Sequence, residues 1–170
     1  MRKRTKFYKF IIDIHLLPVI ITPLALWLIS GYHKFKTFVT GTMWGPDPSA
    51  WIPWLKTHFN GIVLMDNYFI IVCLFFTLMI LQLLTGILFL VGLLKGEFII
   101  TRTKHWLSAA FIFSMINIAL LSFGQNLAND DNDVFQLTSY FVAHLFCLFY
   151  INYVTEKFFL KDRRELTKAP

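Results

Sequence analysis

The sequence is poor in charged residues: Asp, Glu, Lys and Arg make up only 15% of its 170 positions. Soluble globular domains carry about 25% charged residues, so this chain has too few charges to cover a water-soluble globule. Hydrophobic residues account for 56% of the chain, and its mean hydropathy is +0.60. The composition therefore excludes an ordinary soluble domain and indicates an integral membrane protein.

Cysteine is also scarce. The chain has two cysteines, Cys73 and Cys147, and no C-x-x-C pair, so a thiol–disulfide relay lacks its reactive dithiol. Counted by helical rise, the two residues lie at different depths in the membrane. A disulfide requires Cα atoms within about 7 Å, so we expect two unpaired, buried cysteines with a structural role.

Common catalytic and metal-binding motifs are missing. There is no P-loop, no G-x-G-x-x-G and no H-E-x-x-H, the patterns that hold phosphates or catalytic zinc. The five histidines are dispersed, and only His144 lies deep in an apolar stretch. Bis-histidine haem needs two imidazoles at matching depth, so the pattern disfavours haem. We predict no metal site and no covalently bound cofactor.

Four long apolar stretches are present, at residues 10–32, 68–94, 106–123 and 135–154. Each is close to or above the length of about 20 residues that a helix needs to cross a bilayer. Backbone amides in hydrocarbon need internal partners, so such stretches form helices. The predicted fold is all-α: a transmembrane four-helix bundle that makes up one domain, residues 1–170.

The distribution of basic residues predicts the orientation. All but three of the 16 lysine and arginine residues lie in the two tails or in the loop between the second and third stretches. These segments share one side of the membrane if all four helices span it. The positive-inside rule then predicts that both termini are cytoplasmic, in the inner (cytoplasmic) membrane. The net charge of +6 is explained in this way, and no groove-reading motif points to nucleic acid.

A long aromatic segment, residues 36–66, separates the first two predicted helices on the outer side. It contains Trp44, Trp51 and Trp54, and tryptophan is typical of the membrane interface. Residues 49–59 are predicted to form a short helix within it. The segment is either a lid packed on the end of the bundle or a lid over a quinone or lipid site.

Polar residues inside the predicted spans are the remaining candidates for function. Such residues are costly in a membrane and tend to face the bundle interior. Gln82, Asn117 and His144 could form one interhelical hydrogen-bond network, with a proton-coupled or quinone-binding role of His144 as the alternative. Lys34 either extends its ammonium to the membrane surface or supplies a cation to a pocket beneath the aromatic segment. The candidate ligand-binding residues are His33, Lys34, Trp44, Trp51, Trp54, Gln82, Asn117 and His144.

Two segments resemble the DoxX/DoxD family of small four-helix membrane proteins. They are S-G-Y-H-K-F at the end of the first stretch and L-Q-L-L-T-G-I-L-F-L-V-G-L-L in the second. The residues that carry the resemblance are Gly31, Lys34, Phe35, Gly86, Gly92 and Leu93. Gln82 stands where the family has a glutamate, which favours an accessory role over catalysis. The resemblance implies association with redox proteins of the cytoplasmic membrane; one branch is the small subunit of thiosulfate:quinone oxidoreductase.

The function we expect is therefore that of a DoxX-like membrane subunit supporting quinone-linked redox metabolism. The alternative is a non-enzymatic structural or assembly subunit of a larger membrane complex. The expected partners are the lipid bilayer and other membrane subunits, with a homo-oligomer left open and no nucleic acid. A quinone is the one cofactor that the pattern favours. The sequence does not decide whether the chain has turnover of its own.

Overall fold

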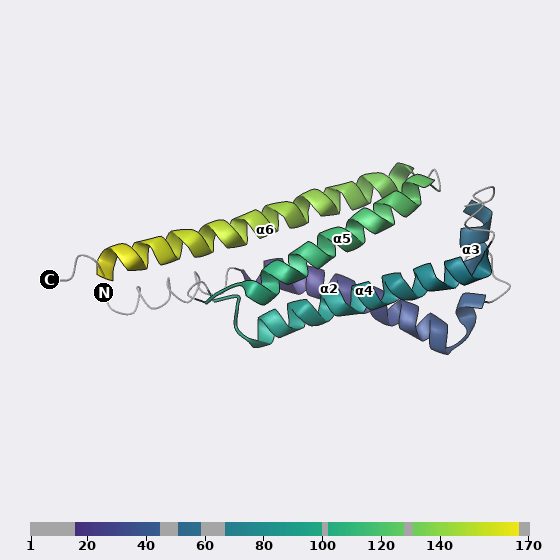
Figure 1. Ribbon diagram of the computed structural model, residues 1–170, viewed down its shortest axis with the longest axis horizontal. Helices are drawn as coiled ribbons and strands as arrows, with labels where there is room; N and C mark the ends of the chain where they lie inside the picture. Colours follow the sequence, from purple (N-terminus) through teal and green to yellow (C-terminus); the bar gives the residue numbers. More distant parts are fainter. Residues whose placement is uncertain (1–15, 45–50, 59–66, 100–101, 128–130, 167–170) are drawn as a thin grey trace.

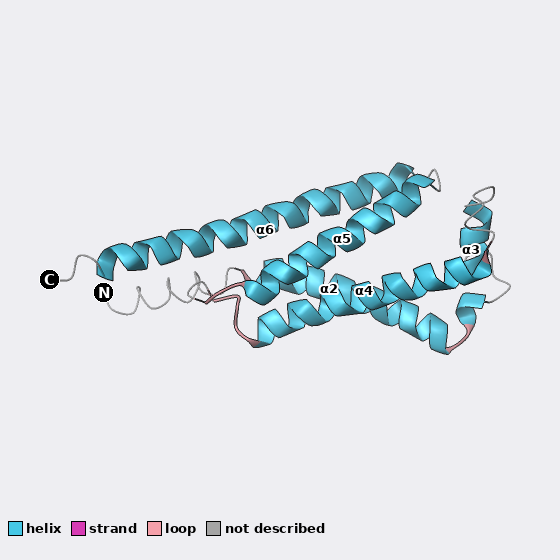
Figure 2. Cartoon of the chain, in the orientation of Figure 1, coloured by secondary structure: helices cyan, strands magenta, loops and turns pink. Residues whose placement is uncertain are grey.

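The computed structural model describes residues 16–44, 51–58, 67–99, 102–127 and 131–166 (Figure 1). These residues form helices joined by short turns and contain no strand (Figure 2), which confirms the predicted all-α class. The helices are α2 (Leu17–Val39), a 3-10 turn η1 (Thr42–Trp44), α3 (Trp51–His58), α4 (Tyr68–Leu94), α5 (His105–Leu127) and α6 (Asp131–Leu166).

Helix α4 has the bounds that its apolar run predicts. Its first turn is capped by the side chain of Asn67, which accepts a hydrogen bond from the backbone N–H of Phe69 at 3.0 Å. Its last turn is followed by Gly96, whose φ of +69° places it in the left-handed region that glycine adopts at helix ends. The short helix predicted within residues 49–59 is confirmed as α3.

Three helices run beyond their predicted ends. Helix α2 continues to Val39 and takes in the first residues of the segment 36–66, while α5 and α6 pass the predicted ends at 123 and 154. Loss of hydropathy marks where a helix leaves hydrocarbon, but lysine, glutamate and arginine remain good helix formers. Residues 10–15, where the first predicted span begins, lie outside the described residues.

Three helices are long and apolar enough to cross a membrane. The qualifying segments are Phe69–Leu94, His105–Asn126 and Asp133–Tyr153. Helix α2 is not among them within the described part of the chain, because its second half carries His33, Lys34 and other polar residues. Length and composition thus indicate a membrane protein with three helices able to span, and a fourth span remains a prediction.

The long helices pack mainly against their neighbours in chain order: α2 on α4, α4 on α5, and α5 on α6. Figure 1 shows α5 and α6 side by side, with α2 crossing α4 beneath them. Among the described residues α2 and α6 make no comparable contact. The long helices therefore form a row in chain order, and the predicted transmembrane four-helix bundle remains a prediction.

Two clusters of buried side chains hold the row together. The first joins α2, α4, α5 and α6 and includes Trp27, Phe89 and Phe111. The second lies at the end of the molecule where α3 packs, which we call the α3 end, and includes Ile52 of α3 and Phe75 of α4. The described part of the aromatic segment thus packs on one end of the helices, which is consistent with both of its interpretations.

Candidate functional site

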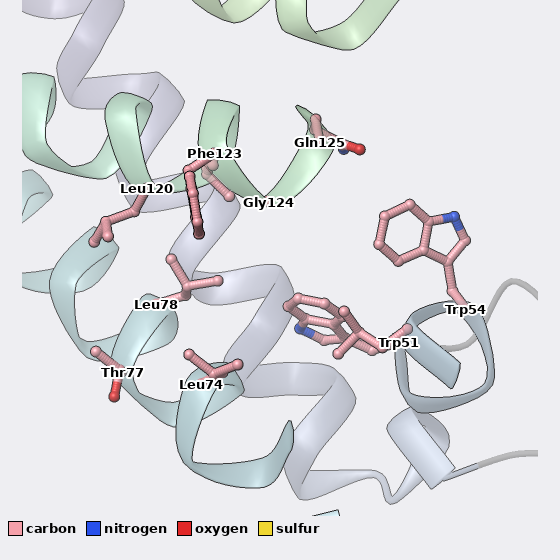
Figure 3. Close-up of a pocket in the computed structure, with 11 residues that line it drawn as sticks. Trp51, Trp54, Leu74, Thr77, Leu78, Leu120, Phe123, Gly124 and Gln125 are labelled. Atoms are coloured by element: carbon pink, nitrogen blue, oxygen red, sulfur yellow. The ribbon is translucent and has the colours of Figure 1, made fainter. Parts of the chain in front are cut away.

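A pocket of about 290 Å³ lies at the α3 end, between α3, α4 and α5 (Figure 3). Its wall is almost entirely aliphatic and aromatic. The lining residues are Trp51, Trp54 and Leu55 from α3, Leu74, Thr77 and Leu78 from α4, and Leu120, Leu121, Phe123, Gly124 and Gln125 from α5. A concave apolar surface with few polar atoms is the usual form of a small-molecule site.

The pocket exists because of how α3 is seated. Ile52 and Leu55 are buried in the cluster with α4, and this seating turns Trp51, Trp54 and one side of Leu55 to the cavity. The Trp51 ring makes edge-on contacts with two other rings. Its centroid lies 5.5 Å from that of Phe75 and 6.3 Å from that of Trp54. On the facing helix, a Cβ atom on Gly124 would meet no atom within 4 Å. A larger residue at this position would fill the space.

Two polar atoms in the wall have no hydrogen-bond partner. They are the indole N–H of Trp51 and the side-chain carbonyl oxygen of Gln125, both buried. The amide nitrogen of Gln125 donates to Asp133 at 3.2 Å, which sets the orientation of the amide and leaves its oxygen unpaired. Buried polar groups nearly always have partners. The apolar wall thus carries one unused donor and one unused acceptor, which are available to a ligand with complementary groups.

The pocket brings together only part of the predicted ligand-binding set. Trp51 and Trp54 line it, whereas Trp44 lies in η1 and is exposed. His33 is exposed on α2, with its ring beside that of Tyr32. Lys34 is half-buried and donates to the Ser30 hydroxyl at 3.4 Å, so it does not reach the lining of this pocket.

Gln82 belongs to a separate polar contact between α2 and α4. Its side-chain oxygen accepts a hydrogen bond from the Ser30 hydroxyl at 2.9 Å. Lys34 reaches the same hydroxyl, so Ser30 links the ammonium group to the amide. The amide nitrogen of Gln82 is buried without a partner, so the contact leaves one donor unused in the packed row.

Asn117 joins α5 to α4. Its amide nitrogen donates to the Thr85 hydroxyl at 2.8 Å and to the backbone oxygen of Leu81 at 3.2 Å. One turn before Asn117 on α5, the Ser114 hydroxyl accepts a hydrogen bond from the Trp27 indole of α2 at 2.6 Å. These bonds fasten three helices to one another, and interhelical hydrogen bonds in membranes contribute about 0.6–2 kcal/mol each.

His144 takes no part in these bonds. Its Nδ1 lies 2.7 Å from the backbone oxygen of Tyr140, one turn earlier on α6, and its ring meets Phe111 edge-on. A carbonyl can only accept, so Nδ1 donates the proton and Nε2 is left buried without a partner. The expectation of one network through Gln82, Asn117 and His144 is wrong. The Gln82 oxygen accepts from Ser30 of α2, the Asn117 amide donates to α4, and His144 bonds its own helix.

The cysteines are both free, and one of them corrects the prediction. Cys147 is half-buried beside the first cluster, but Cys73 is exposed on α4. An apolar helix carries no sequence periodicity to show which of its faces is packed. Burial of Cys73 was inferred from hydropathy alone, and hydropathy does not distinguish a packed face from an open one.

The sequence interpretation did not include the α5 side of the pocket. The third predicted stretch ends at Phe123. The pocket is lined by this residue and by the two that follow it, Gly124 and Gln125. The signal that marks them is a glycine followed by an amide residue in a helix end that faces the tryptophan segment. Among the residues that the structure describes, no group of three His, Cys, Asp or Glu side chains could hold a metal ion.

Comparison of the chain with protein-family models, with curated proteins and with solved structures yields no match. The class of protein is therefore defined by the helices and the pocket themselves. Its described residues are all-helical, with three helices able to cross a membrane and an aromatic pocket at one end.

Proposed function

We propose that this chain is an integral membrane, DoxX-like accessory subunit whose pocket at the α3 end binds the head group of a quinone. The observation that carries the proposal is the pair of unpaired polar atoms in an otherwise apolar wall, on Trp51 and Gln125. A quinone ring is flat and apolar and carries two carbonyl acceptors. The indole N–H can donate to a carbonyl of the quinone, and the Gln125 oxygen can accept from a hydroxyl of the quinol.

The position of the pocket also suits a lipid-soluble ligand. Several lining side chains are open on the outside of the helix row: Leu74 is 38% exposed, Leu120 44% and Phe123 66%. In a bilayer these side chains face acyl chains. An isoprenoid tail can therefore stay in the lipid while the head ring occupies the cavity.

The lining favours binding over catalysis by this chain alone. It contains tryptophan, leucine, threonine, phenylalanine, glycine and glutamine, none of which exchanges protons near neutral pH. Reduction of a quinone takes up two electrons and two protons, and the pocket wall offers no group for either. We infer that the electrons come from a partner redox protein, which is consistent with an accessory subunit.

The proposal includes four spans in the cytoplasmic membrane with both termini inside. Helix α2 lies along α4, and Gly31 and Gly86 allow their backbones to come close. If α4 crosses the bilayer, α2 crosses beside it and the number of spans is even. The basic residues of the tails and of the loop after α4 then lie on the cytoplasmic side.

The test is a titration of the purified chain with a short-tailed quinone, followed by quenching of tryptophan fluorescence. In Gly124→Leu the new side chain fills the cavity, so we expect saturable quenching to be lost. Trp51→Phe removes one neutral hydrogen bond and should weaken binding about threefold to tenfold. Ala119→Leu, which adds a leucine on an exposed position of α5 outside the lining, is the matched control.

Wild-type binding by Gly124→Leu would overturn the pocket assignment. If Trp51→Phe binds the quinone with wild-type affinity while Gly124→Leu does not, the quinone occupies the pocket without a hydrogen bond from the Trp51 indole. Trp44→Phe serves as a second control, since Trp44 does not line the cavity and its fluorescence contributes to the same signal.

The second candidate, a structural or assembly subunit, is favoured by α6. Among the described residues this helix packs mainly on α5, and Phe135, Phe146 and Phe149 are exposed along it. Purification in mild detergent separates the candidates. A partner protein at fixed stoichiometry with no extractable quinone supports the assembly role, and retained quinone supports the redox role. A self-associated chain without quinone would instead indicate a homo-oligomer.

A further inference from the structure

A second cavity, of about 420 Å³, lies at the end of the molecule opposite α3, where a short loop joins α4 to α5. Unlike the pocket at the α3 end, it is lined mainly by polar and charged side chains. Three of them are basic: Lys95, Arg102 and His105. We infer that this cavity is a binding site for the phosphate group of an anionic phospholipid.

The described residues of this loop, 95–99 and 102–104, are held in place by hydrogen bonds. Arg102 donates from Nη1 to the backbone oxygen of Lys95 at 3.0 Å. Lys104 is buried, and its ammonium donates to the backbone oxygens of Glu97 and Ile99. Gly96, with φ of +69°, makes the turn that starts the loop. The cavity wall is therefore formed before any ligand arrives.

The one carboxylate in the wall is already engaged. Glu97 accepts hydrogen bonds from the backbone N–H groups of Trp106 and Leu107, at 3.2 and 2.9 Å. These groups belong to the first turn of α5, whose positive end stabilises a negative charge. The carboxylate thus compensates the helix terminus and leaves Lys95 and Arg102 without a carboxylate partner among the described residues.

The free basic groups have the chemistry that recognises phosphate. Only one of the five guanidinium N–H donors of Arg102 is used by Lys95. The Lys95 ammonium lies 4.4 Å from the centroid of the Trp106 ring, which holds it at the cavity. Arginine and lysine together form charge-assisted hydrogen bonds with phosphate oxygens.

The surroundings of the cavity point to a lipid as the source of the phosphate. Leu94, which is 77% exposed, and Trp106, which is 38% exposed, flank the basic groups. Both lie at ends of helices that are apolar enough to cross a membrane. Basic pockets between helices at a membrane surface bind anionic headgroups, and here the acyl chains would extend along α4 and α5.

The inference is tested by thermal unfolding of the full chain in a neutral detergent, with added lipid. Phosphatidylglycerol should raise the melting temperature, whereas phosphatidylcholine at equal concentration should not. In the double variant Lys95→Gln/Arg102→Gln, the apparent affinity for phosphatidylglycerol should fall about tenfold or more, because charge-assisted hydrogen bonds are lost. Lys36→Gln, an exposed lysine of α2, is the control and should keep the wild-type response.

Each outcome decides the inference. An unchanged response of the double variant overturns the site, and an equal effect of inorganic phosphate overturns a lipid as its source. If the double variant fails to fold, Arg102→Lys and Arg102→Gln are compared instead. The site is supported if the lysine variant retains affinity for phosphatidylglycerol and the glutamine variant loses it. Wild-type affinity in both variants overturns the site. These measurements contain no quinone, so their outcome is independent of the proposed quinone site.

Discussion

Leu28 of α2 lies directly over Gly86 of α4: a Cβ atom on this glycine would stand 2.6 Å from Cδ2 of Leu28 and 3.1 Å from its backbone nitrogen. The contact is reciprocal, because Leu83 of α4 lies over Gly31 of α2 in the same way, at 2.7 Å. Each helix thus places a leucine on the other's glycine. Two of the residues that carry the resemblance to the DoxX/DoxD family therefore have a packing role in this chain.

Gly86→Ala is expected to destabilise the protein by about 1–3 kcal/mol, the usual cost of overpacking a close contact. The Leu28 side chain can rotate away from the new methyl group, but its backbone nitrogen cannot move without shifting α2. Unfolding in detergent measures the effect. Gly124→Ala is the control, because nothing lies within 4 Å of its Cβ position and alanine favours a helix. Equal stability of the two variants would contradict the packing role.

Ser30→Ala is expected to destabilise the protein by about 0.6–2 kcal/mol. The hydroxyl is the hydrogen-bond partner of the Gln82 oxygen, and its loss leaves the whole buried amide unpaired. Thr22→Ala is the control, since that hydroxyl only bonds the backbone oxygen of Pro18 on an exposed face. The loss on Ser30→Ala should shrink in a Gln82→Leu background. If the two changes are additive, the bond contributes nothing to stability.

Glu97→Ala is expected to loosen the start of α5 at a cost of about 1–2 kcal/mol, as for other lost helix caps. Hydrogen exchange gives the sharper measurement: the amides of Trp106 and Leu107 lose their acceptor and should exchange faster than in the wild type. Glu156→Ala, which removes an exposed carboxylate from α6, should leave both amides unchanged. Unchanged exchange in Glu97→Ala would exclude the capping role.

Lys104 predicts a pH dependence of stability. Burial lowers the pKa of this lysine from 10.5 to about 8, against the opposing effect of the Glu97 charge. Between these two values the unfolded chain binds more protons at this site than the folded chain does. The contribution of Lys104 to the free energy of unfolding should therefore rise as the pH increases from about 8 to 10.5 and stay constant below that window.

The comparison of wild type with Lys104→Met isolates this effect, because all other groups titrate alike in both proteins. The difference in melting temperature should grow in favour of the wild type as the pH is raised from 8 towards 10. A difference that stays flat or falls across this range would show that the pKa of Lys104 is not depressed in the fold.

Parts of the fold could be predicted from the sequence because they depend on local properties. The bounds of α4 follow from an apolar, uncharged run that lies between the polar residues Asn67 and Lys95. The short helix α3 and its tryptophans follow from composition and from the break at the glycines and prolines before it. Helix ends beyond the apolar runs could not be predicted from hydropathy. Helix α6, for example, continues to Leu166 through charged residues that favour a helix.

The candidate site could be predicted only on one side. Trp51 and Trp54 were identified from the sequence, and both line the pocket. Gly124 and Gln125 were not, because a small residue and an amide near a helix end gain meaning only from what faces them. The same holds for Glu97, which caps the start of α5 by accepting a hydrogen bond from the N–H of Leu107. Hydropathy does not show that the chain turns back between these two residues.

The sequence by itself determined that this is an all-helical chain whose apolar helices can cross a membrane, since run length and charge decide which segments can satisfy their backbone in lipid. Tertiary structure alone decided that each long helix packs mainly on its neighbours in chain order, that Asn117 bonds α4 while His144 bonds its own helix, and that a pocket forms under α3. The reason is physical: helices that are apolar on every side do not specify which faces meet, and close contacts such as Leu28 on Gly86 decide it.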